Sequence, residues 1–266
     1  MSALKTDLSG QVAVITGSTS GIGAALAEGL AECGANVVLN GLGPQDEIER
    51  LRKRLETEHK VKVKYHPANM MEADEIGGLI RYAESEFGRL DILVNNAGIQ
   101  HVSPIDEFPA GKWEAILKIN LTSNFHTIKN ALPIMKRQGS GRIVNLASAH
   151  GLVASPFKSA YVAAKHGVLG LTKTVALEVA ETGITVNAIC PGYVKTPLVE
   201  NQIADTAKAR GISEEEVVRD VMLAAQPTKR FVEYSQLVGA LLFLVSDAGA
   251  SCNGTHISVD GGWTAK

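Results

Sequence analysis

Short apolar segments alternate with longer amphipathic segments along nearly the whole chain. The apolar segments, rich in Val and Ile, lie at 12–16, 36–40, 61–66, 91–95, 141–146, 184–189 and 255–259. Apolar runs of this length and composition predict buried β-strands. The intervening segments have the hydrophobic spacing of helices, which we expect at 22–33, 44–59, 72–87, 112–136, 159–180 and 235–245.

This alternation predicts an α/β fold. Strands that are apolar on both faces and separated by helices form a parallel sheet covered on each side, and right-handed crossovers make it a doubly wound sheet of about seven parallel strands with helices on both faces. The 266 residues, of which 45% are hydrophobic, contain no linker-like stretch. We therefore expect one domain, 1–266, whose ligand binds beyond the carboxyl ends of the strands.

Charge and cysteine content limit the classes of ligand and the cellular compartment that we expect for this protein. The 26 basic and 28 acidic residues form no long run of one sign, so the sequence has no electrostatic footprint for nucleic acid or an anionic membrane. The three cysteines are widely spaced, the N-terminus lacks an apolar signal core, and the apolar run 237–245 is too short to span a bilayer. We expect a soluble cytoplasmic protein with a small-molecule ligand and, since no histidine pair has ligand spacing, no metal.

Tyr161 and Lys165 stand four residues apart in a predicted helix, and Ser148 follows the strand at 141–146. The spacing puts the phenol and the ammonium on one helix face, where the cation is expected to favour the phenolate and make Tyr161 a proton-transfer group. The alternative for the pair alone is an amphipathic helix with a packed tyrosine and a solvated lysine.

Glycines 17, 21 and 23 lie between the first strand and the first helix. They allow a tight turn in which the backbone approaches a pyrophosphate that faces a helix N-terminus. The spacing Gly-x-x-x-Gly-x-Gly differs from the more common Gly-x-Gly-x-x-Gly of dinucleotide sites, and a structural turn without a ligand is the alternative.

Taken in order, these motifs resemble the classical short-chain dehydrogenases/reductases over nearly the whole chain. The resemblance is carried by Thr-Gly-x-x-x-Gly-x-Gly at 16–23, Asn-Asn-Ala-Gly at 95–98, Asn120, Ser148, Tyr161-x-x-x-Lys165 and Pro191-Gly192. It implies a Rossmann-type domain that binds a nicotinamide dinucleotide and transfers hydride without a metal.

The resemblance also implies roles for individual residues. Tyr161 is the acid/base, Lys165 lowers its pKa and binds the nicotinamide ribose, Ser148 hydrogen-bonds the substrate oxygen, and Asn120 bends its helix around a proton-relay water. The implied coenzyme-binding residues are Gly17, Thr19, Ser20, Gly21, Ile22, Gly23, Leu42, Asn69, Met70, Asn96, Ala97, Gly98, Tyr161, Lys165, Pro191, Gly192, Val194 and Thr196. For Asn120 a plain helix-interior amide is the alternative, and for Ser148 a turn or cap.

The end of the second strand favours NAD over NADP. It reads Asn40-Gly41-Leu42-Gly43, with neither the carboxylate that binds ribose hydroxyls nor a cation for a 2′-phosphate. The first basic residue after the strand is Arg50, inside a predicted helix, and leaving a phosphate unpaired is costly.

The residues around the predicted catalytic group resemble those of bacterial D-3-hydroxybutyrate dehydrogenases within this family. The implied substrate-binding residues are Gln100, Ser148, His150, Lys158, Tyr161, Gln202 and Trp263. Amide, imidazole and ammonium groups together can orient a carboxylate, and the implied reaction is reversible oxidation of (R)-3-hydroxybutyrate to acetoacetate with NAD. Taken singly, Lys158 and Gln202 are also typical of solvated surface residues, His150 of a loop histidine and Trp263 of a packing residue.

Three further expectations complete the interpretation. The segment 198–227 is predicted to form a helical lid over the substrate. By family resemblance the protein is a homotetramer, with the helices at 112–136 and 159–180 at the interfaces. The alternatives are an NADPH-dependent 3-oxoacyl-carrier-protein reductase, for which the sequence lacks a recognisable basic dock, and a non-catalytic NAD-binding scaffold.

Overall fold

A computed structural model describes residues 6–265, apart from the side chains of Pro197, Leu198, Asn201, Gln202 and Ala209. Within this part, seven strands form one parallel sheet in the order β3-β2-β1-β4-β5-β6-β7. The strands are β1 (Val12–Ile15), β2 (Asn36–Asn40), β3 (Val63–His66), β4 (Ile92–Asn95), β5 (Gly141–Leu146), β6 (Ile184–Pro191) and β7 (His256–Val259). The order reverses between β1 and β4, which creates a crevice at their carboxyl ends.

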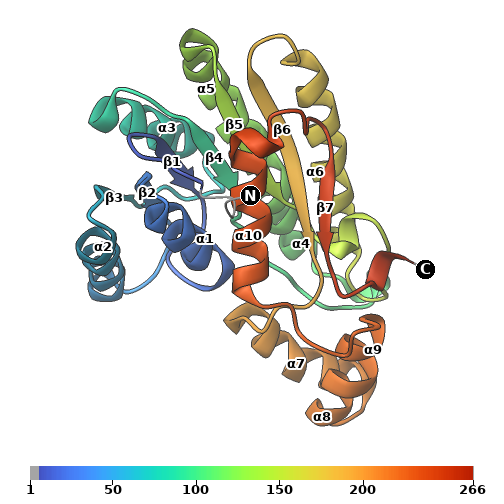
Figure 1. Ribbon diagram of the computed structural model, residues 1–266. Helices are drawn as coiled ribbons and strands as arrows, with labels where there is room; N and C mark the ends of the chain where they lie inside the picture. Colours follow the sequence, from blue (N-terminus) through green and yellow to red (C-terminus); the bar gives the residue numbers. More distant parts are fainter. Residues whose placement is uncertain (1–5, 266) are drawn as a thin grey trace.

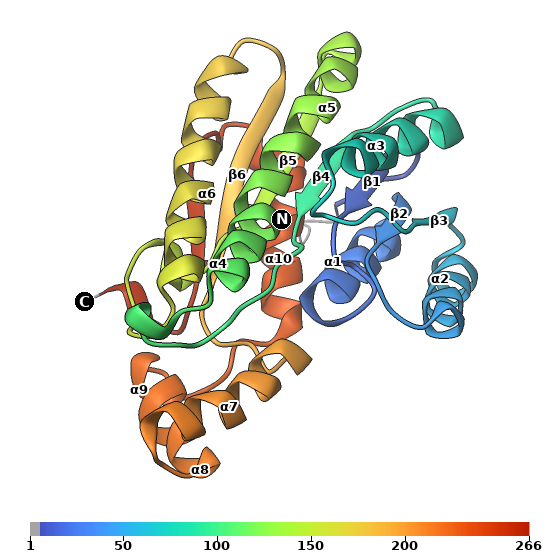
Figure 2. The same ribbon diagram turned by 180° about the vertical axis from the view of Figure 1, so that it is seen from behind.

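Helices cover both faces of the sheet (Figures 1 and 2). One face carries α1 (Gly21–Glu32), α2 (Gln45–His59) and α10 (Tyr234–Val245), and the other carries α3 (Ala73–Phe87), α4 (Ala110–Leu117), α5 (Ser123–Gln138) and α6 (Ser159–Glu178). Three further helices, α7 (Pro197–Arg210), α8 (Glu214–Glu216) and α9 (Leu223–Ala225), lie beyond the carboxyl ends of the strands, at the bottom of Figure 1. Short 3₁₀ turns occupy Ile105–Glu107, Ala149–Gly151, Asp247–Gly249 and Trp263–Ala265.

Alternate residues of each central strand enter two separate hydrophobic layers. On β1, Ala13 and Ile15 pack with the α1, α2 and α10 side, whereas Val14 packs with the α3, α5 and α6 side. All three side chains are buried. This is the burial on both faces that the apolar runs predicted, and it makes the sheet a rigid platform for the loops at its carboxyl edge.

The predicted fold class is confirmed, and the differences from the predicted elements have physical causes. The edge strand β7 is partly exposed along its length because it pairs with another strand on one side only. The predicted helix at 112–136 is divided into α4 and α5 by a π-helical segment, Lys118–Thr122. The predicted lid segment, 198–227, contains α7 and the short helices α8 and α9, which are joined through a π-helical segment, Val217–Met222.

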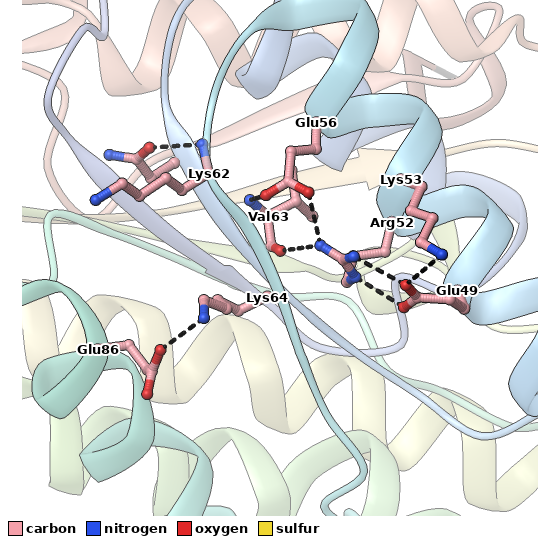
Figure 3. Close-up of polar contacts among 9 residues, drawn as sticks. Glu49, Arg52, Lys53, Glu56, Lys62, Val63, Lys64 and Glu86 are labelled. Carbon is pink, nitrogen blue, oxygen red and sulfur yellow. Dashed lines mark hydrogen bonds and ion pairs between the residues drawn. The ribbon is translucent and has the colours of Figure 1, made fainter.

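Ion pairs attach the opposite edge strand, β3, to its neighbouring helices (Figure 3). Arg52 of α2 pairs with Glu49 and donates a hydrogen bond to the carbonyl oxygen of Val63 at 2.9 Å, and Lys64 pairs with Glu86 of α3 at 2.9 Å. Charged side chains at a sheet edge oppose pairing with a second strand. No helix in the described part of the chain is long and apolar enough to cross a membrane.

Candidate active site

A cavity of about 440 Å³ lies at the carboxyl edge of the sheet. Every residue predicted to bind the coenzyme lines it, as do Gln100, Ser148, His150, Lys158 and Trp263 of the predicted substrate site. The cavity is also lined by residues for which no ligand contact was predicted: Asn40, Gly41, Ala68, Ile99, Ile119, Leu146, Ala147, Tyr193 and Val199. One cavity therefore brings together the segments that follow all seven strands.

The glycine-rich turn after β1 has the conformation that its sequence requires. Gly17 and Gly21 have positive φ angles of 62° and 55°, which disfavour other residues. A Cβ atom on Gly23 would lie 2.2 Å from the carbonyl oxygen of Gly17, so only glycine allows α1 to approach the turn this closely. The side-chain amide of Asn96 donates 2.9 Å hydrogen bonds to the carbonyl oxygens of Thr16 and Gly17. The Asn95–Gly98 loop thus supports the turn, and the residues present fit a bound pyrophosphate.

Asn40 has a structural role that the sequence did not reveal. The side chain is fully buried, accepts a hydrogen bond from the Gly17 amide at 3.2 Å, and donates to the carbonyl oxygens of His66 and Ala68. It therefore joins the loops after β1, β2 and β3 instead of facing the cavity as a free polar group. The adjacent Leu42 is 71% exposed.

Asn69, predicted to bind the coenzyme, lines the cavity, and its side-chain carbonyl already accepts a hydrogen bond. That oxygen accepts a hydrogen bond from the Met71 amide at 3.0 Å, and the Asn69 backbone amide donates to Glu75 at 2.8 Å. A carbonyl oxygen has two lone pairs, so one acceptor position is left.

Three of the predicted catalytic side chains line the cavity together. Ser148 follows β5, and Tyr161 and Lys165 lie on α6. Lys165 lies one helical turn after Tyr161, and its ammonium is 5.6 Å from the centre of the phenol ring. That ammonium donates a 2.6 Å hydrogen bond to the carbonyl oxygen of Leu146 at the end of β5. Ser148, two residues further on, accepts a hydrogen bond from the His150 amide at 3.2 Å, which holds the hydroxyl at the cavity wall.

Lys165 is not among the groups that shift the pKa of Tyr161 in this structure. Burial raises the pKa of Tyr161, with a hydrogen bond from Ser148 acting in the opposite direction, and burial lowers the pKa of Lys165 to about 8. The reason is that both groups are desolvated, and the ammonium is bonded to a backbone carbonyl rather than to the phenol oxygen.

Asn120 lies behind the cavity wall, inside the π-helical segment. Its side-chain oxygen accepts a hydrogen bond from the Ile99 amide, and its nitrogen donates to the Ile99 carbonyl oxygen, both at 2.9 Å. The π-helical segment interrupts the regular α-helix at this residue. Because a π turn widens the helix by one residue, the amide reaches the loop that follows Gly98 and fixes it.

Two of the predicted carboxylate-binding residues, His150 and Lys158, both contact Tyr193 at the other end of the cavity, and Gln100 also lines the cavity. Gln100 Nε2 and His150 Nε2 are buried and have no hydrogen-bond partner within the described residues. Burial and, to a smaller extent, the charge of Lys158 lower the pKa of His150 to about 3, and burial and the charge of Arg210 lower the pKa of Lys158 to about 8. Unpaired buried polar groups are costly, and a ligand carboxylate would satisfy them. Gln202 was predicted to join them, but its side chain lies outside the described part.

Aromatic rings line the end of the cavity that is predicted to bind the substrate carboxylate. The Trp263 ring stacks on Tyr193 with centroids 5.1 Å apart, and His150 meets Trp263 edge-on at 4.8 Å. Sequence reasoning missed Tyr193, although its position directly after Pro191-Gly192 could have indicated it. The buried Gln226 was also missed: its side chain accepts from the Tyr193 amide and donates to the Arg230 carbonyl oxygen. No short-range sequence pattern links these residues.

The chain matches the family model described as short chain dehydrogenase over residues 11–207. It belongs to the short-chain dehydrogenase family. It is 57% identical to "D-beta-hydroxybutyrate dehydrogenase" of Rhizobium meliloti over 96% of this chain and 99% of that protein. It is 51% identical to "D-beta-hydroxybutyrate dehydrogenase" of Cupriavidus necator, over 97% of this chain and 100% of that protein.

Solved structures of the family have the same fold. The crystal structure of a single-residue variant of actinorhodin polyketide ketoreductase with NADPH aligns over 100% of both chains, with a TM-score of 0.91 and 32% sequence identity. The chain is accordingly an oxidoreductase of the short-chain dehydrogenase type, with a site for a nicotinamide coenzyme.

Proposed function

We propose that this protein catalyses the reversible, NAD-dependent oxidation of (R)-3-hydroxybutyrate to acetoacetate. The observation that carries the proposal is that one cavity is lined by Ser148 and Tyr161 and also by Lys158, Gln100 and His150. The side-chain Nε2 atoms of Gln100 and His150 are buried and have no hydrogen-bond partner among the described residues. Two relatives with more than half of their residues identical to this chain are named D-beta-hydroxybutyrate dehydrogenase, which supports the same choice.

Within this proposal, NAD⁺ supplies the carbon that accepts hydride from the carbinol of the substrate. Tyr161 takes the hydroxyl proton as the ketone forms and returns it in the reverse direction. Ser148 donates a hydrogen bond to the reacting oxygen, whose charge changes during the step. Lys165 lies beside the phenol and, as in the family, holds the nicotinamide ribose. Asn120 keeps the Ile99 loop in place behind this group.

The preference for an acid follows from the other end of the cavity. Lys158 is 6% exposed, and no acidic side chain in the described part of the chain forms a salt bridge with it. A carboxylate placed among Lys158, His150 and Gln100 supplies the missing partner, whereas an uncharged alcohol does not. Gln202 of α7 is proposed as a fourth contact.

The adenosine end of the cavity supports NAD. The cationic residues among the described lining are Lys158 and Lys165, and both belong to the catalytic end. Around the loop after β2 the lining consists of Asn40, Gly41 and Leu42, with no group that pairs with a 2′-phosphate.

We propose that 198–227 acts as a substrate lid. In this segment Val217 and Met222 pack on Tyr193, and Val199 lines the cavity. Movement of these helices would open or cover the substrate end and exclude water during hydride transfer.

We also propose that the protein is a homotetramer in the cytoplasm. Phe125 on α5 and Leu177 on α6 are 46% and 81% exposed, which supports contacts between copies through these helices. Light scattering at micromolar concentration should give four chain masses. A single chain mass would contradict the assembly without affecting the proposed reaction.

Initial rates with NAD and NADP test the reaction and the coenzyme together. The substrates are both enantiomers of 3-hydroxybutyrate, longer 3-hydroxy acids and uncharged butan-2-ol. We expect the highest kcat/KM with (R)-3-hydroxybutyrate and NAD. Preference for butan-2-ol would refute the carboxylate pocket, preference for NADP would refute the coenzyme choice, and binding of NADH without turnover of any substrate would favour a non-catalytic scaffold.

A further inference from the structure

Tyr193 lies just beyond the end of β6 and contacts three residues that line the substrate end of the cavity, Trp263, His150 and Lys158. It is 7% exposed, stacks on Trp263, and presents an edge contact to His150 with centroids 6.2 Å apart. Its hydroxyl accepts a 3.2 Å hydrogen bond from the Lys158 ammonium, which also lies 5.1 Å from the centre of the ring. The ammonium therefore contacts the phenol at its hydroxyl end.

Lys158 depends on this contact for its position. Among the described residues, the Tyr193 hydroxyl is the only hydrogen-bond partner found for the Lys158 ammonium. The lysine side chain has four rotatable bonds and three N–H donors, so one bond to a rigid phenol orients the group and leaves two donors for a ligand. The ring itself is immobilised by the stack on Trp263, and its backbone amide is bonded to Gln226.

We propose that Tyr193 is a positioning residue that holds the Lys158 ammonium where the substrate carboxylate binds, and that it thereby sets the preference for hydroxy acids over uncharged alcohols. This inference rests on the proposed function and adds to it a residue that touches the carboxylate-binding group rather than the reacting atoms. The hydroxyl, not the ring, is the part that acts through Lys158.

Tyr193→Phe tests this role because it removes the oxygen and keeps the stack on Trp263. We expect KM for (R)-3-hydroxybutyrate to rise about tenfold, the size of effect that loss of one hydrogen bond to a charged group produces, with a change in kcat of less than about threefold. The rate with butan-2-ol should stay the same. Tyr82→Phe on α3, outside the cavity lining, is the matched control and should leave both constants unchanged.

A double-mutant cycle separates the hydroxyl from ring packing. Lys158→Met keeps the apolar stem and removes the cation. If Tyr193 acts through Lys158, Tyr193→Phe adds no further loss of kcat/KM in the Lys158→Met background. An equal loss in both backgrounds, or an unchanged KM in Tyr193→Phe alone, would overturn the inference. If the proposed function itself is wrong, the wild-type enzyme will show no preference for the hydroxy acid over butan-2-ol. This result distinguishes failure of the proposed function from failure of the inference on Tyr193.

Discussion

Burial sets the protonation of the catalytic pair more strongly than the mutual contact of its two groups. Desolvation raises the pKa of the Tyr161 phenol and lowers that of Lys165 to about 8, so at neutral pH the phenol carries its proton and the lysine is mostly charged. A protonated phenol suits reduction of the ketone. Oxidation of the alcohol needs the phenolate and should accelerate as the pH rises.

Tyr161→Phe removes the proton carrier and preserves the ring. We expect kcat to fall by about 10²–10⁴-fold, the usual contribution of a positioned acid/base, while the dissociation constant for NADH changes little. Steady-state rates and NADH fluorescence titration measure the two quantities. Turnover within about tenfold of the wild type would show that another group transfers the proton.

The Lys158 ammonium gives a pH dependence that is specific to acid substrates. Its pKa is lowered to about 8, so the cation is present below this pH and is lost above it. Of the titratable groups in contact with this end of the cavity, burial lowers the pKa of His150 to about 3 and raises the pKa of Tyr193 to about 12, so neither titrates near pH 8.

The kcat/KM for 3-hydroxybutyrate, divided by that for butan-2-ol, should therefore be constant at low pH and decrease above about pH 8. Forming the ratio cancels the titration of Tyr161, which serves both substrates. Lys158→Arg keeps a cation throughout and should abolish the decrease. A ratio that is flat well beyond this pH in the wild type would show that Lys158 does not bind the carboxylate.

The turn that leads into α1 depends on close approach between backbone segments. Gly23→Ala would place a Cβ atom 2.2 Å from the Gly17 carbonyl oxygen and 2.4 Å from the Asn96 side-chain nitrogen, so the turn or the Asn96 loop must move. We expect NADH affinity to fall at least about tenfold and the melting temperature to drop by several degrees.

Gly239→Ala on α10 is the control, because this glycine is exposed and a Cβ atom added to it would have no neighbour within 4 Å. The change should stabilise the protein by about 0.5–1 kcal/mol, since alanine favours the helix, and leave NADH affinity unchanged. Equal NADH affinities in the two variants would show that the turn does not contact the coenzyme.

The sequence correctly predicted the elements that depend on local hydrophobic patterns. It did not predict the features that depend on contacts between distant segments. The strands and six main helices occur within a few residues of their predicted bounds, because apolar periodicity reflects which side of the sheet a residue faces. The π-helical segment at Lys118–Thr122 was not predicted as such, because its stability comes from the bonds between Asn120 and Ile99, 21 residues away.

Ligand binding should change the accessibility of α7–α9, which extend from the sheet without being covered by its two helical layers (Figures 1 and 2). NAD with acetoacetate is a non-reacting pair, since both are oxidised. Tryptic cleavage at Arg210, Arg219 and Lys229 should slow at least severalfold when both are present, while cleavage at Lys53 in α2 is unchanged. Mass spectrometry of the fragments measures this. Equal cleavage with and without ligands would contradict the lid.

The chain's pattern alone determined the doubly wound sheet, the glycine turn and the spacing of Tyr161 and Lys165, because each depends on residues close in sequence. Only the tertiary structure decided that Asn40 is buried as a support, that burial rather than Lys165 controls the pKa of Tyr161, and that Tyr193 meets Lys158 and Trp263. Desolvation and side-chain contacts arise from segments that are far apart along the chain, and no local pattern encodes them.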